Sequence, residues 1–218
     1  MLNANRFVSM VTKGKAGKID KKALLPEDKA ILSRLNRVIK EGTEAFDRFE
    51  FSKCLNPARN FFWLEFADFY IEEVKSRVYN DKGASGKAAA AVLQEIAWKS
   101  LLLFTPFVPH TAEEIAQEHF KERLSGKSIC LEQWPKADES FIDEEVEKVG
   151  EAINSIIAEM RKQKSEARKP LNTPVKKAVV TIENAKNLEQ SAEVIKRTMA
   201  VEALEVKEGK EFSVKIEF

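Results

Sequence analysis

The sequence predicts a mainly α-helical chain, an antiparallel helical bundle followed by a small α+β unit. In the first part, apolar residues recur at spacings of three and four, the period of an amphipathic helix. Glycine (8) and proline (7) are few among 218 residues, which argues against a turn-rich all-β fold. Patterns typical of strands occur only after Pro174. We therefore expect two domains, one at 1–140 and one at 141–218.

The bundle is predicted from helical segments separated by loops and breakers. Pro26 suits the first position of a helix, and Glu27 and Asp28 suit its first turn. Pro57 interrupts the aromatic segment, where we expect either a kink or a restart capped by Asn56. The expected helices are 1–12, 26–46, 52–79, 87–104 and 112–123, the last begun by a capping box at 111–114. Residues 124–140 are expected to be irregular, with 128–134 extended.

The predicted second domain is a long helix followed by a β-α-β-β segment. Apolar residues from Ile142 to Met160 alternate spacings of four and three, a heptad seam about three repeats long. A seam of this kind either packs on its own domain or pairs with a partner helix. Strands are expected at 175–183, 203–206 and 212–218, a helix at 186–198, and a hairpin turn at 208–210.

The net charge of +1 hides a strong asymmetry. Residues 138–159 contain eight acids and one base, and residues 160–177 contain seven bases and one acid. Complementing a helix dipole explains part of this pattern, because acids favour the start of a helix and bases its end. Lys176 and Lys177 lie beyond that helix, so a basic patch that contacts phosphate is an equally good interpretation.

The residues give no sign of a catalytic or metal site. Cys54 and Cys130 are too few for a disulfide framework and fit a reducing cytoplasm. With His110 and His119 they show no metal-ligand spacing, and no Gly-rich phosphate loop is present. The start of the sequence does not have the form of a signal peptide, and no apolar run is long enough to span a membrane.

Four segments resemble one enzyme family. Residues 2–7 (LNANRF) are similar to the LWNA-x-RF segment that opens the anticodon-binding helical domain of class I aminoacyl-tRNA synthetases, although the tryptophan is missing here. Residues 59–72 (RNFFWLEFADFYIE) resemble a helix of the valyl-tRNA synthetase family. The segments at 103–114 (LFTPFVPHTAEE) and 128–135 (SICLEQWP) match later pieces of the same domain in order and spacing.

The resemblance implies that this chain is the C-terminal anticodon-binding part of such an enzyme. The family's two nucleotide-binding signatures, HIGH and KMSKS, are absent. ATP and Mg²⁺ would then bind in the missing catalytic part, with no cofactor and no catalytic residue in this chain. The implied partners are tRNA(Val) and the catalytic body of the parent enzyme. The chain is expected to be a cytoplasmic monomer that does not bind a membrane.

The candidate RNA-binding residues combine amides, arginines and lysines near the two basic segments. Amides offer both a donor and an acceptor to a base edge, and arginine stacks on a base or binds phosphate. For the asparagines, helix capping or packing against the catalytic body is the alternative role. The candidates are Asn3, Asn5, Arg6, Lys13, Lys15, Lys18, Arg161, Lys164, Arg168 and Lys169. For Arg59, Asn60 and the Phe-rich helix that follows them we favour a structural role.

Two other functions remain open at this point. The heptad seam at 142–160 fits a helical protein–protein interaction module, and the motifs fit the equivalent region of isoleucyl-tRNA synthetase.

Overall fold

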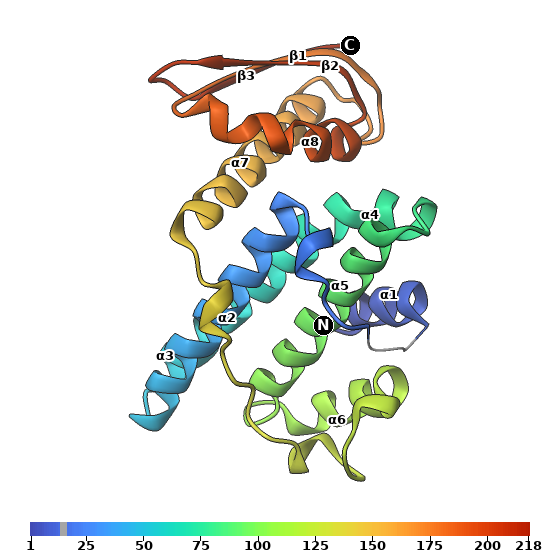
Figure 1. Cartoon of the computed structure of the whole chain (residues 1–218), viewed down its shortest axis with the longest axis vertical. Coiled ribbons are helices and arrows are strands. Elements are labelled where there is room, and N and C mark those ends of the chain that lie inside the picture. Colours follow the sequence, from blue (N-terminus) through green and yellow to red (C-terminus); the bar gives the residue numbers. More distant parts are fainter. Residues whose placement is uncertain (14–16) are drawn as a thin grey trace.

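The computed structural model describes residues 1–13 and 17–218 and contains a helical bundle and a small α+β unit (Figure 1). The fold class predicted from the sequence is confirmed. The bundle consists of α1 (Leu2–Thr12), α2 (Pro26–Asp47), α3 (Phe51–Asn60), η2 (Phe61–Tyr70), α4 (Ile71–Asn80), α5 (Ala84–Phe104) and α6 (Pro109–His119). The α+β unit consists of α7 (Glu144–Glu166), β1 (Val175–Ile182), η6 (Ala185–Ser191), α8 (Ala192–Met199), β2 (Val201–Glu208) and β3 (Ser213–Glu217).

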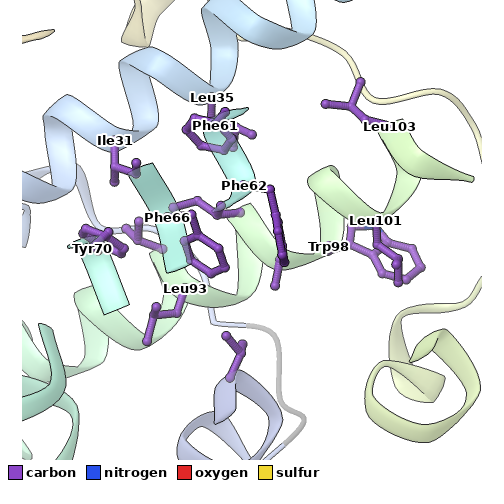
Figure 2. Close-up of a cluster of buried hydrophobic side chains, with 14 of the residues drawn as sticks. Ile31, Leu35, Phe61, Phe62, Phe66, Tyr70, Leu93, Trp98, Leu101 and Leu103 are labelled. Carbon is purple, nitrogen blue, oxygen red and sulfur yellow. The ribbon is translucent and has the colours of Figure 1, made fainter. Parts of the chain in front are cut away.

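The bundle is built around the aromatic helix. Figure 2 shows Phe61, Phe62 and Phe66 turned toward side chains of α2 and α5, and all three are at most 1% exposed. The Phe62 ring meets the edge of Phe104 at 5.7 Å between centroids. The prediction that this helix forms core is confirmed. Arg59 and Asn60, just before Phe61, are exposed, and the structural role favoured for them stays a prediction.

The aromatic helix, made of α3, η2 and α4, changes from α-helical to π-helical backbone and back without a break. We expected a kink or a capped restart at Asn56–Pro57, but α3 runs through Pro57 without restarting. The backbone becomes π-helical from Phe61 to Tyr70 and returns to α-helix at Ile71. A proline removes one helical hydrogen bond, and a π-helix adds one residue to each turn. Residue spacing alone signals neither change, because the apolar face continues through both.

Residues 109–141 differ from the prediction in two places. Helix α6 begins at Pro109, not after Thr111, since proline is well suited to the first helical position. Glu113 therefore does not cap α6, and its carboxylate accepts hydrogen bonds from Ser128 and Ile129 instead. The segment at 128–134 is not extended; it contains the 3₁₀ turn η4 (Ile129–Leu131). Two similar turns flank it, η3 (Lys121–Arg123) and η5 (Glu139–Phe141), and η1 (Lys21–Ala23) precedes α2.

The sheet of the α+β unit has the order β2-β1-β3. β1 pairs parallel with β2 and antiparallel with β3, so the predicted hairpin between the last two strands is wrong. β1 takes the centre because Val175, Ala178 and Val180 are fully buried. The chain crosses the end of β1 at Gly209, whose N–H donates to Ile182 O. A Cβ at Gly209 would lie 2.4 Å from Thr181 Cγ2, so the crossing needs glycine.

The second half of the heptad seam is buried inside the chain itself, whereas Ile142, Val146 and Val149 in its first half are half-buried. Ile153, Ile156 and Met160 are at most 1% exposed and form a second core with β1 and α8. The alternative of a partner-recruiting seam is therefore not favoured.

Helix α7 also packs closely on α2. A Cβ at Gly150 would lie 2.6 Å from Ala30 Cβ, and Glu147 accepts hydrogen bonds from Arg37 and Ser33. The acidic first part of α7 thus forms ion pairs with arginine side chains of α2. The domain boundary near residue 140 stays a prediction. Within the described residues, no helix combines the length and the apolar character that crossing a membrane requires.

Candidate nucleic-acid interface

Helix α1 presents a polar and basic stripe. Its exposed residues recur at Asn3, Arg6, Met10 and Lys13, so they share one face of the helix. The opposite face carries Val8, which is fully buried against the bundle. Met10 is 62% exposed, which places an apolar side chain among the polar ones. A stripe of this composition suits a ligand with both charged and flat apolar parts.

Two lysines at and after the end of the stripe in the sequence are described by the structure, and both are exposed. Lys13 ends the helix in the left-handed conformation (φ 54°), and its side chain is exposed. Lys18 is exposed as well. Lys15 lies outside the described residues, so its predicted role stays a prediction.

Asn5 does not belong to the stripe. It is fully buried, and its Nδ2 donates to Met1 O at 3.0 Å. Its Oδ1 is also buried and has no hydrogen-bond partner among the described residues. The prediction that Asn5 contacts RNA is therefore wrong, because its amide is packed inside the bundle, where it makes no helix-capping hydrogen bond.

Lys164 is a buried structural residue. Its Nζ donates to three carbonyl oxygens, those of Leu171 (2.8 Å), Thr173 (2.7 Å) and Met199 (2.9 Å). All three ammonium protons are used, and burial lowers the pKa of the group. The prediction that Lys164 binds RNA is wrong, because the end of α8 covers the side chain.

Arg161 connects the two parts of the molecule. Its Nη1 donates to Asp68 O in η2 at 3.0 Å, and its guanidinium lies 4.9 Å from the Phe69 ring centroid. The side chain is half-buried, so it is positioned by the bundle but still reaches solvent.

Arg168 and Lys169 form an exposed basic corner after α7. Arg168 adopts a left-handed backbone (φ 53°), and Lys169 Nζ lies 4.5 Å from the Phe218 ring centroid. Lys176 Nζ donates to Phe218 O at 3.0 Å, whereas Lys177 pairs with Glu205 at 3.1 Å. Figure 1 places this corner in the α+β unit, away from α1, so the two basic surfaces are separate.

A buried charge cluster joins α2, α4 and α8. Arg77 binds both carboxylate oxygens of Asp28, at 2.8 and 2.7 Å, and also Glu27 at 3.1 Å. Tyr70 Oη donates to Asp28 at 2.7 Å, and burial raises the tyrosine pKa. Arg197 reaches Glu27 from α8 at 3.0 Å. The sequence did not predict this cluster, since Glu27 and Asp28 were expected only to interact with the dipole of α2.

Glu73 lies beside the cluster without a partner of its own. It is 4% exposed, and its Oε1 has no hydrogen bond to any described residue. Burial, together with repulsion from Glu27, raises the pKa of Glu73 to about 8. The carboxyl group is therefore largely protonated at neutral pH in the folded chain.

Residues 28–180 match the family described as the anticodon-binding domain of tRNA ligases. The chain belongs to this family. The match begins in α2 and ends in β1, so it includes most of the bundle, the basic corner and the start of the sheet.

Curated relatives of this anticodon-binding domain are named valine–tRNA ligase. Those of Pyrococcus horikoshii and Thermococcus kodakarensis are each 41% identical over 187 residues, which is 85% of this chain and 21% of the relative. That of Methanosarcina barkeri is 40% identical over 162 residues, 74% of this chain and 18% of the relative. The anticodon-binding domain thus spans about a fifth of the length of these relatives.

Proposed function

We propose that this anticodon-binding domain recognises the anticodon stem-loop of tRNA(Val) as one part of a valine–tRNA ligase. The observation that carries the proposal is the similarity of about 40% to valine–tRNA ligases over most of the chain. The catalytic body of that enzyme would bind ATP and Mg²⁺ and join valine to the tRNA. The present chain would supply RNA recognition and need no cofactor.

The exposed stripe on α1 supports this function physically. Anticodon bases are unpaired, and proteins read such bases by stacking and by hydrogen bonds to their edges. Asn3 and Arg6 offer an amide and a guanidinium on one face, next to the exposed Met10. Lys13 and Lys18 would hold backbone phosphate, and Arg168 and Lys169 would hold another part of the tRNA.

A binding measurement with whole transcripts tests the proposal. We expect the full chain to bind tRNA(Val), and to bind a transcript with a changed middle anticodon base about tenfold more weakly, since one base contact contributes roughly 1–3 kcal/mol. Equal and feeble binding to all tRNAs at moderate salt would contradict the proposal.

A pair of matched variants tests the residues. Arg6→Gln should weaken binding to tRNA(Val), whereas Arg59→Gln, which removes another exposed arginine from a helix, should not. Equal losses in the two variants would show that α1 has no particular role.

We also propose that the chain is a monomer that works in the cytoplasm. The second half of the seam that could have paired two copies is buried in the chain's own core, and both cysteines are free thiols. Light scattering at two concentrations should give one mass.

A further inference from the structure

A cleft lies where the bundle meets the α+β unit. It encloses about 370 Å³, a volume within the range of small-ligand sites. Asp68 and Glu72 line it from the bundle, Arg161 and Asn172 from α7 and the loop after it, and Met199 from the end of α8. Arg161 is the one lining residue that was a candidate for RNA binding from the sequence.

The planar guanidinium of Arg161 forms one wall of the cleft, and contacts with η2 fix its position. The Arg161 guanidinium lies over the Phe69 ring and donates to the Asp68 carbonyl, so two contacts fix its plane. No other hydrogen bond from this guanidinium to a described residue is present. A guanidinium oriented in this way offers a flat face on which a nucleobase stacks.

The polar edge of the cleft is suited to a base and not to a phosphate. The exposed Asp68 carboxylate has no hydrogen-bond or ion-pair partner among the described residues, whereas Glu72 pairs with Lys75 at 2.5 Å. A free carboxylate repels phosphate but accepts the exocyclic amino group of a base. The Asn172 amide, also exposed, adds a donor and an acceptor across the cleft.

Two exposed cations come just before two of the cleft residues in the sequence. Arg168 and Lys169 precede Leu171 and Asn172 in the loop after α7, and both are exposed.

We propose that this cleft holds one unpaired base with an exocyclic amino group, cytosine or adenine, of an RNA bound to the domain. The inference rests on the proposed function, since a single base binds well only when the rest of the RNA is held elsewhere. Arg161 stacks on the base, and the Asp68 carboxylate accepts its amino group.

Substitution of single loop bases, combined with two acid variants, tests this site. The full chain is titrated with anticodon stem-loop RNAs in which each loop cytosine is replaced by uracil and each adenine by purine, which lacks the amino group. We expect one replacement to weaken binding about tenfold, the size of one base contact. Asp68→Asn should weaken binding to the unmodified RNA similarly and lose nothing further on that replacement.

Glu211→Gln is the matched control, because it removes one exposed acidic charge between β2 and β3, at the opposite end of β1 from Met199. If Asp68 acts only through its charge, both variants should bind every RNA slightly more tightly, and that result would overturn the cleft assignment. Specific binding with no effect of any amino-group removal would overturn it too, while leaving the proposed function intact. Failure of all RNAs to bind would remove both proposals. Because Asp68 is exposed, far-UV circular dichroism should show both variants folded.

Discussion

Lys164 is the buried cation on which the loop after α7 depends. Its ammonium satisfies three backbone carbonyls from two segments. Lys164→Ala should lower the free energy of unfolding by about 3 kcal/mol, since buried acceptors lose charged donors. Lys169→Ala, five residues later and exposed, should change it by less than about 0.5 kcal/mol. Urea titration of both variants measures the difference, and equal midpoints would contradict this role.

Glu73 should make the stability of the domain depend on pH. Its pKa is raised from 4.5 to about 8, by burial first and by Glu27 second. Arg161 and Arg197 oppose the shift, and Asp28 adds to it. Between these two pKa values the folded state holds a proton that the unfolded state has lost, so this residue lowers stability as pH rises from about 4.5 to about 8.

The substitution Glu73→Gln tests this linkage. The variant keeps a neutral side chain of similar shape, so it should exceed the parent in stability by about 3 kcal/mol at pH 8. At pH 4 the advantage should vanish, because both states of the parent are then protonated. Glu72→Gln, at the half-exposed neighbouring position, is the control. Parallel pH profiles for Glu73→Gln and the parent, measured by urea unfolding, would rule out the raised pKa.

At the residue scale, the sequence shows which chemical groups a segment carries, but not which of them are buried. Asn3 and Asn5 are both amides in one short helix, yet only Asn5 turns inward. Lys164 and Lys169 belong to one basic run, and the end of α8 decides which of them is buried. Asp68 belongs to the family motif at 59–72, but the sequence could not show that it lies beside Arg161 and Asn172, which come from distant segments.

At the scale of elements, apolar periodicity predicts where helices and strands occur, whereas packing decides how the strands are ordered in the sheet. The Phe-rich helix, α2 and α7 all lie close to the expected positions, since each has a strong apolar face. The order of the strands could not be read from alternation, which β2 and β3 share. It follows from the burial of β1, a property of the assembled unit.

The crossing after β2 gives a prediction at this scale. Gly209→Ala should destabilise the chain by about 1–3 kcal/mol, because the new methyl group would overlap Thr181 unless the strand shifts. Gly126→Ala is the control, since its added Cβ would meet only Leu131 Cδ1 at 4.0 Å. Thermal unfolding followed by circular dichroism compares them. A tolerated Gly209→Ala would mean that the chain does not pass so close to β1.

At the scale of the whole molecule, ion pairs link the bundle, with its buried core, to the α+β unit, which has a core of its own. The Arg77 cluster and the Glu147 pairs both bridge the bundle and the α+β unit. A net charge of +1 conceals how the charges are distributed, because acids gather at 138–159 and bases at 160–177. Near-neutral composition is therefore compatible with binding a polyanion at two separate surfaces.

The salt dependence of RNA binding measures that surface charge directly. Each phosphate contacted in single-stranded RNA contributes a slope of about −0.7 to the plot of log K against log salt. Replacing Arg6, Lys13 and Lys18 together with glutamine should flatten the slope by about 2. The control replaces Lys207, Lys210 and Lys215, three exposed lysines at the end of the chain, and should leave the slope nearly unchanged. Equal flattening by both sets would mean that RNA is held by total charge, whereas a selective loss assigns the phosphate contacts to α1 and the loop that follows it.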